Sequence, residues 1–319
     1  MDERLAKKQL RSVFSKQAWA LLVYYMLMST LVSSVMVFDV LIRGIAQGFD
    51  AFLNEKSLEK LLMEAASNGW GYILSCLLGG VLLLVWKKKE FCFHSIWVSE
   101  HKMSAGAFLG VVSVLVASQA LFQLYAMLME YLSQLLGGSI MESLEMATSI
   151  GDSFSMFLYA GIFAPVFEEI LFRGLILRSF SDYGKKFAIF ASAFLFGVFH
   201  GNIIQTPWAF AVGLLLGYVT VEYSIGWAML LHMINNLVLG DMMSRLLELL
   251  PTGVGDTVFY VVLLAGLLIA VVFAIVQRRK IRSWHRIGKL NPICVNSFFT
   301  SPGVLVFCGM MLINILLLL

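Results

Sequence analysis

Long apolar runs recur along this chain and constrain its fold more than any other feature. They cover approximately these residues: 18–38, 70–86, 105–128, 153–177, 187–204, 207–223, 226–247, 257–277 and 303–319. A helix needs about 20 apolar residues to cross a bilayer. The composition agrees, because 13% of the residues are charged, whereas soluble domains carry about 25%. We therefore predict an all-α polytopic membrane protein, a bundle of about eight transmembrane helices within a range of seven to nine.

Positive residues gather in a few segments beside the apolar runs. If the N-terminus is cytoplasmic, the inner segments hold the basic clusters at residues 4–16, 87–102, 178–186 and 277–289. The outer segment at 129–150 has no Lys or Arg but contains Glu130, Glu142 and Glu145. This distribution satisfies the positive-inside rule and predicts a multi-pass plasma-membrane protein with a cytoplasmic N-terminus. The first run is too long for a signal peptide, so we expect an uncleaved first span.

The chain divides into three parts by its connections. Residues 1–150 are predicted to hold the N-terminal spans and surface segments, with loosely amphipathic helices possible at 44–66 and 132–150. Short connections join the helices of 151–247, which are therefore predicted to pack as one bundle. Residues 248–319 are predicted to form the C-terminal span or spans with a basic cytoplasmic segment. The four cysteines are scattered without a CxxC pair, which argues against a disulfide framework or a zinc knuckle.

The apolar stretch FAPVFEEILFRGLIL, at residues 163–177, contains three ionisable side chains. Charges inside a bilayer are costly and occur mostly where they pair or serve a function. On a helix, Glu169 and Arg173 stand four residues apart on one face, whereas Glu168 points elsewhere. We therefore predict a stabilising Glu169–Arg173 ion pair, with Glu168 as a carboxylate outside this pair. Asp152 or Ser153 is predicted to cap the start of this helix.

Two further apolar runs carry polar groups, namely His200 in FGVFHGN and His232, Asn235 and Asn236 in HMINN. Helical rise places Glu168, His200 and Asn236 about 15–20 Å from the cytoplasmic ends of their helices. His232 lies shallower, at about 9 Å. His232 and Asn236 share a helix face. The polar groups of three helices are therefore predicted to converge at a similar depth.

Two histidines, an amide and a free carboxylate suit the activation of water. A carboxylate in a low-dielectric site can act as a general base near neutral pH, helped by a histidine that shares the water. The remaining histidine and the amide are donors that can stabilise an oxyanion on a peptide carbonyl. Other interpretations stay open at this point. A single histidine or asparagine can serve as an interhelical contact, and the whole set can form the ion path of a proton-coupled transporter.

Three motifs occur in order on these helices: EExxxR at 168–173, FxxxH at 196–200 and HxxxN at 232–236. The ordered set resembles the CPBP family of CAAX-protease and bacteriocin-processing intramembrane endopeptidases, also called the Abi family. The resemblance covers about residues 153–247, that is, the predicted central bundle, and it leaves out the first three spans and the C-terminal ones.

The resemblance implies a role for each matching residue. Glu168 and His200 would activate the attacking water, and His232 with Asn236 would form the oxyanion site. Glu169 and Arg173 would shape the pocket and balance its charge, as the predicted ion pair already indicates.

We therefore expect an intramembrane endopeptidase, a hydrolase that acts on a peptide or membrane-protein substrate in a cavity open toward the cytoplasm. The resemblance implies a glutamate-based mechanism without a cofactor, and the sequence lacks HExxH. The alternative is a Zn²⁺ ion held by Glu168, His200 and His232. The bilayer is a partner, no nucleic acid is expected, and nothing in the sequence identifies a prenyl pocket. Two other functions compete: a non-proteolytic, partner-binding or immunity-type protein of the same fold, and the transporter.

Overall fold

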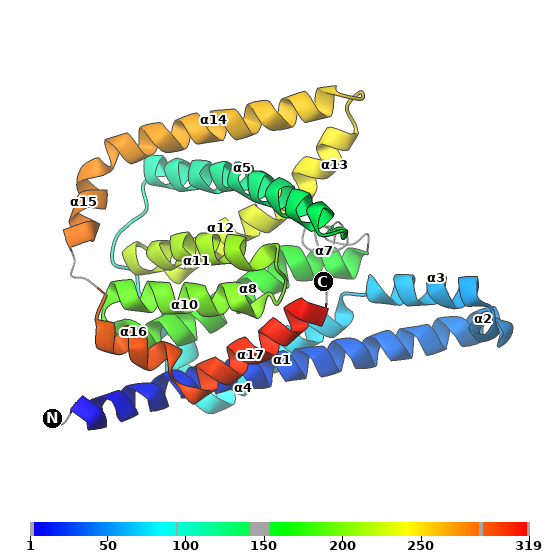
Figure 1. Ribbon diagram of the computed structural model, residues 1–319, viewed down its shortest axis with the longest axis horizontal. Coiled ribbons are helices and arrows are strands. Elements are labelled where there is room, and N and C mark those ends of the chain that lie inside the picture. The colour runs from blue at the N-terminus through cyan, green and yellow to red at the C-terminus, as the bar shows by residue number, and fades with distance from the viewer. Residues whose placement is uncertain (1–2, 94, 141–152, 287–289, 318–319) are drawn as a thin grey trace.

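The computed structural model describes residues 3–93, 95–140, 153–286 and 290–317, which form a bundle of helices with no strand in these ranges (Figure 1). The N-terminal part contains the following elements: α1 (Glu3–Gln47), α2 (Asp50–Leu53), α3 (Glu55–Ala66), α4 (Trp70–Phe93), the 3-10 turn η1 (Ser95–Trp97) and α5 (Ala105–Leu135). The predicted all-α fold is confirmed. Helices α2 and α3 occupy the stretch at 44–66. Glu142, Glu145 and Asp152 lie outside the described residues, as does most of the stretch at 132–150.

The central part begins with one continuous helical run, which Ser153 caps by accepting a hydrogen bond from Met156 N. Within the run, α-helical, π-helical and 3-10 turns alternate: α7 (Phe154–Leu158), π-helix η2 (Tyr159–Phe163), α8 (Ala164–Glu169), π-helix η3 (Ile170–Leu177), α9 (Arg178–Phe180) and 3-10 turn η4 (Ser181–Tyr183). The elements that follow are α10 (Lys185–Phe199), α11 (Gln205–Glu222), α12 (Ile225–Met233), π-helix η5 (Ile234–Met242) and α13 (Met243–Glu248). Ser153 is therefore the predicted cap of the helix that carries the two glutamates.

The C-terminal part contains α14 (Val254–Val276), α15 (Arg278–Arg286), α16 (Pro292–Phe299) and α17 (Pro302–Leu317). Four helical stretches in the described part of the chain are long and apolar enough to cross a membrane alone: α1, residues 55–87, α5 and α14. The bent pair α16 and α17, which meet at 55°, makes a fifth if it counts as one span. The predicted number of about eight is not confirmed, because π-helical segments and short breaks divide the central helices into pieces.

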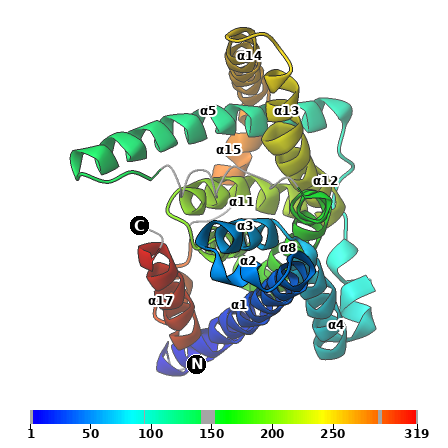
Figure 2. The same ribbon diagram turned by 90° about the vertical axis from the view of Figure 1, so that its right-hand side faces the viewer.

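The central helices lie between two outer layers (Figures 1 and 2). Helices α5 and α14 pack against each other on one side, and α1, α4 and α17 lie on the other. Helix α10 packs mainly on α11. A cluster of rings ties the N-terminal end of α1 to this centre, since Phe14 lies 5.0 Å from Phe180, 5.3 Å from Phe187 and 5.8 Å from Phe298 between ring centroids. The central segment therefore shares its core with α1 and α16.

The basic helix α15 is anchored by a single acidic side chain at the end of α11. Glu222 Oε1 lies 2.6 Å from Lys280 Nζ, and Glu222 Oε2 accepts a hydrogen bond from Trp284 Nε1 at 3.3 Å. Partial burial is the largest single effect on Lys280 and lowers its pKa, but the hydrogen bond with Glu222 and the charge interactions with Tyr218, Glu222 and Tyr223 together outweigh it, so the pKa lies above its usual value. Helix α15 lies at the same end of the bundle as the start of α1 (Figure 1).

Helix α10 ends earlier than the apolar run at 187–204 predicts. The helix stops at Phe199, because Gly201 takes the left-handed conformation with φ of 57°. Asn202 then starts the next helix, and its Oδ1 accepts from Ile204 N at 2.8 Å and from Gln205 N at 3.2 Å. His200 is therefore the C-cap residue directly after α10 rather than part of a longer helix, and Asn202 has a structural role at the start of the next helix.

We predict that Gly197→Ala destabilises the protein, because α10 and α11 meet at this glycine. An added Cβ would lie 2.7 Å from Thr206 O and 2.9 Å from Phe210 Cβ. Overpacking of this kind costs about 1–3 kcal/mol, so thermal unfolding in detergent should begin at a lower temperature. Gly309→Ala on α17 is the matched control, because a Cβ there meets no atom within 4 Å. Equal melting temperatures for the two variants would contradict the close approach of α10 to α11.

Candidate active site

The predicted site residues lie on helices that contain π-helical turns. Arg173 lies in η3, Asn235 and Asn236 lie in η5, and the carbonyl of Ala160, which accepts from Asn236, lies in η2. A π turn is a wide turn of helix, and such turns occur often at functional sites. Each one shifts the direction of the side chains that follow it, although the i, i+4 spacing of Glu169 and Arg173 still brings that pair together.

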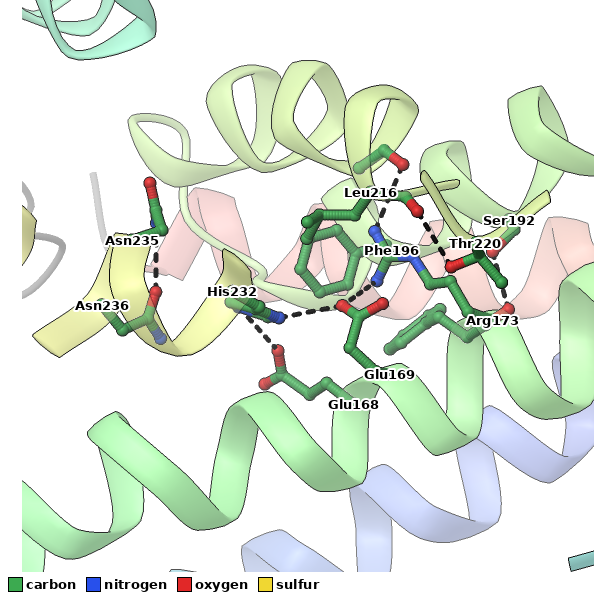
Figure 3. A network of polar contacts seen from close by, with 12 residues as sticks. Glu168, Glu169, Arg173, Ser192, Phe196, Leu216, Thr220, His232, Asn235 and Asn236 are labelled. Carbon is green, nitrogen blue, oxygen red and sulfur yellow. Dashed lines mark hydrogen bonds and ion pairs between the residues drawn. The ribbon is translucent and has the colours of Figure 1, made fainter. Parts of the chain in front are cut away.

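The Glu169–Arg173 ion pair lies at the centre of the site (Figure 3). Arg173 Nη1 donates to Glu169 Oε1 at 2.8 Å, and neither side chain is exposed. Arg173 Nη2 also donates to the carbonyl of Gly213 on α11 at 3.2 Å, and the guanidinium lies 4.3 Å from the centre of the Phe196 ring. One arginine thus connects three helices around a buried carboxylate.

His232 is the second partner of that carboxylate. Its Nδ1 lies 2.9 Å from Glu169 Oε1, the same oxygen that accepts from Arg173. A carboxylate beside an arginine can only accept, so His232 Nδ1 carries the hydrogen. The ring is nearly buried, and it meets the edge of Phe196 with centroids 5.7 Å apart. Glu169 therefore sets both the position of the ring and the nitrogen that stays available, which is Nε2.

Glu168 faces that available nitrogen (Figure 3). Its Oε2 lies 3.8 Å from His232 Nε2, and its side chain is 14% exposed, whereas Glu169 is fully buried. Around Glu168, within electrostatic range, stand Tyr24 of α1, Cys76 of α4 and Tyr159 of η2. The two neighbouring glutamates therefore differ in kind: Glu169 is a fully buried structural acceptor, and Glu168 is a partly exposed carboxylate with His232 Nε2 at 3.8 Å.

His200 approaches the same group from the end of α10. Its Nδ1 lies 2.8 Å from Phe196 O. A carbonyl oxygen only accepts, so Nδ1 carries a hydrogen and Nε2 is the nitrogen left for other partners. His200 and His232 both contact the Phe196 ring, with centroid distances of 4.8 and 5.7 Å, and His232 faces Glu168. Phe196 and His232 thus connect His200 with Glu168, which the sequence places on a different helix.

Asn236 is held one turn beyond His232. Its Nδ2 donates to Ala160 O at 3.0 Å, and its Oδ1 accepts from Asn235 Nδ2 at 3.1 Å. Ala160 precedes Glu168 by eight residues, about 12 Å of helical rise. The amide is thus bound to the helix that carries Glu168, at a point nearer the start of that helix than the carboxylate.

The alternative zinc set has the ligand types that zinc accepts, Glu168, His200 and His232. Among the residues that the structure describes, no three His, Cys, Asp or Glu side chains lie together as ligands of one ion. Each histidine uses Nδ1 toward a protein acceptor, which leaves Nε2 available, and Glu168 Oε2 lies 3.8 Å from His232 Nε2. Histidines that bind zinc commonly donate their other ring nitrogen in this way, so these bonds do not distinguish the metal-free site from the zinc site.

Several residues at the site come from the N-terminal helices, which the motifs do not include. Tyr24 packs on Phe167 at 4.7 Å between ring centroids and bonds to Ser75 and Cys76. Gln119 of α5 donates to Asn235 Oδ1 at 3.3 Å. The one available signal for Gln119 is an amide inside an apolar run, since such residues tend to bond between helices.

The fold and the site together define a polytopic helical membrane protein with a carboxylate–histidine centre inside its bundle. Residues 150–238 match the family model described as Type II CAAX prenyl endopeptidase Rce1-like, and this segment of the chain belongs to the CPBP/Abi family. No curated protein and no solved structure matches the chain. The predicted family is therefore confirmed for this segment, and the match supports an intramembrane endopeptidase, a hydrolase, as the general class.

We predict that Arg173→Met is strongly destabilising and that adding Glu169→Gln restores much of the loss. The single change leaves the Glu169 charge buried without its main partner, and breaking a buried pair in this way costs about 3–5 kcal/mol. The double variant removes that charge as well. Thermal unfolding of both in detergent checks the prediction. A double variant no more stable than Arg173→Met would contradict an ion pair as the source of the effect.

Proposed function

We propose that the protein hydrolyses a peptide bond of a membrane-associated substrate with water activated by Glu168. The observation that carries the proposal is the 3.8 Å separation of Glu168 Oε2 and His232 Nε2, with the other ring nitrogen bound to Glu169. This separation is too long for a direct hydrogen bond, and a water molecule can bond to both atoms across it. The pair thus offers a place for a nucleophile next to a base.

One proton can reside either on Glu168 or on His232 Nε2. Since His232 Nδ1 already carries a hydrogen, which it donates to Glu169, Nε2 carries a second hydrogen only in the imidazolium form. Opposite unit charges about 4 Å apart attract by about 4 kcal/mol at an effective dielectric of 20. We therefore propose Glu168 as carboxylate and His232 as imidazolium at rest. The two glutamates, Arg173 and His232 then sum to zero charge, which avoids an uncompensated buried charge.

In this protonation state each residue can perform the role that the family resemblance implies. Glu168, with His200 Nε2, takes a proton from water while the water oxygen bonds to the substrate carbonyl carbon. His232 Nε2–H and Asn236 Nδ2–H donate to the oxyanion that develops on the carbonyl oxygen. The protonated Glu168 then gives its proton to the leaving nitrogen as the C–N bond breaks. Glu169 and Arg173 hold His232 in place.

We further propose that the reaction needs no metal ion and that the site opens toward the cytoplasm. The glutamate-based mechanism that the family resemblance implies and the lack of HExxH in the sequence support the first point. The gathering of the α1 start, α15 and the basic start of α10 at one end of the bundle supports a cytoplasmic N-terminus. The substrate is a peptide or a membrane protein.

We predict that Glu168→Gln abolishes cleavage without loss of folding or membrane insertion. Glutamine keeps the shape of the side chain but is no base, and general-base catalysis contributes about 10²–10⁴-fold in rate. Terminomics of membrane proteins and secreted peptides should find cleavage products in wild-type cells that are missing in the variant. Glu100→Gln is the control, because this exposed carboxylate pairs with Lys185 at the surface.

Two rival functions give different results in the same strains. A partner-binding or immunity-type protein keeps its phenotype in both Glu168→Gln and His200→Ala. A proton-coupled carrier shows flux in proteoliposomes without any cleaved product. Identical terminomes for wild type and Glu168→Gln would argue against the protease.

We predict that the purified enzyme retains its activity in a chelator titration. In the proposed reaction Glu168 acts first as base and then as acid, His200 assists it, and His232 is a hydrogen-bond donor, so removal of metal ions changes none of these roles. The assay follows cleavage of the identified substrate with increasing EDTA or 1,10-phenanthroline. Complete inactivation that added Zn²⁺ reverses would overturn the metal-free mechanism.

A further inference from the structure

A chain of three side-chain hydrogen bonds enters the site from α5, outside the segment that matches the family. Gln119 Nε2 donates to Asn235 Oδ1 at 3.3 Å, Asn235 Nδ2 donates to Asn236 Oδ1 at 3.1 Å, and Asn236 Nδ2 donates to Ala160 O at 3.0 Å. Figure 3 shows the middle bond, on the helix that also carries His232. All three bonds run in one direction, from α5 through η5 to η2.

The direction follows from what each group can do. The carbonyl of Ala160 only accepts, so it must meet the nitrogen of Asn236 and not its oxygen. Asn236 Oδ1 then accepts from Asn235 Nδ2, and Asn235 Oδ1 faces α5. Asn235 is 2% exposed, and a buried acceptor without a donor is unfavourable. Gln119 supplies that donor. The Ala160 carbonyl fixes the orientation of Asn236, and Gln119, which can donate or accept, completes the chain in that direction.

We infer that Gln119 is a positioning residue for the reaction, which acts by holding the Asn236 carboxamide with its nitrogen toward the substrate. This inference rests on the proposed function, in which Asn236 donates to the oxyanion. The NH₂ group has two hydrogens. One is bound to Ala160 O, and the other is the donor for the substrate. A reversed carboxamide would present oxygen to the developing negative charge, so the orientation affects the transition state more than substrate binding.

The decisive variant is Gln119→Glu, which keeps the shape but changes the hydrogen-bonding capacity. An ionised carboxylate only accepts, so it opposes Asn235 Oδ1 and favours reversal of the whole chain. A protonated carboxyl has one O–H and can donate as Gln119 does. We expect kcat near neutral pH to fall by about 10-fold or more. Complete loss of an oxyanion donor lowers kcat by about 10²–10³-fold, which sets the upper limit, and KM should change little. The ratio of variant to wild-type kcat should rise as the pH is lowered.

Two companion variants separate positioning from packing. Gln119→Met removes the donor without adding an opposing charge, so its kcat should fall less and its ratio to wild type should not change with pH. Gln123→Glu places the same new carboxylate one turn further along α5, on an exposed side chain, and should leave kcat as in wild type. The probe is a fluorophore–quencher peptide built on the cleavage site that the terminomic comparison identifies.

The outcomes distinguish this inference from the proposed function. If Asn236→Ala loses activity but Gln119→Glu keeps wild-type kcat at every pH, the positioning role is wrong and the proposed function stands. If Gln119→Glu and Gln119→Met lose kcat and melting temperature alike, without a pH effect, Gln119 is merely structural and the inference is overturned. If Asn236→Ala retains full activity, the oxyanion role fails first.

Discussion

A single carboxylate oxygen, Oε1 of Glu169, holds the site together. It accepts from Arg173 at 2.8 Å and lies 2.9 Å from His232 Nδ1, in a place without solvent exposure. Arg173 in turn reaches the Gly213 carbonyl and covers the Phe196 ring. Helices α8, α10, α11 and α12 thus meet through one acceptor and its two donors. The geometry of Glu168 depends on this arrangement, because the direction of His232 Nε2 is set by the bond at the opposite side of the ring.

The same interaction explains why two adjacent glutamates can differ in function. In a bilayer, a buried charge needs a partner, and Glu169 has two. Glu168 lies on another face of the helix, keeps partial exposure and meets His232 only at 3.8 Å. A direct strong pair would keep Glu168 from acting on water, whereas complete isolation would leave its charge uncompensated. The observed separation lies between these two cases.

How much of this follows from the sequence depends on how local each contact is. The Glu169–Arg173 pair and the Ser153 cap are local to one helix, so spacing alone predicts them. Depth, counted from the cytoplasmic helix ends, puts Asn236 level with Glu168 and His232 shallower. In the structure His232 faces Glu168 at 3.8 Å, whereas Asn236 bonds to Ala160, eight residues before Glu168. By contrast, the bond from His232 to Glu169 and the end of α10 at Phe199 are tertiary or turn effects. The number of spans stays a prediction, since π turns and breaks divide the central helices into pieces that are shorter than the apolar runs.

The sequence predicts no functional role for the first three apolar runs, yet residues from all three contact the helices that carry the site. Tyr24 of α1 covers Phe167, and Tyr72 of α4 stacks on Tyr159 at 4.6 Å. From α5, Gln119 satisfies Asn235. These contacts exclude solvent and lipid from the faces of the helix that carries the two glutamates, and a low local dielectric strengthens every charge interaction inside. The segment at 150–238 supplies the motif residues, but the N-terminal helices supply part of the apolar packing around them, in which those residues interact strongly. The physical unit of the site is therefore larger than its family motif.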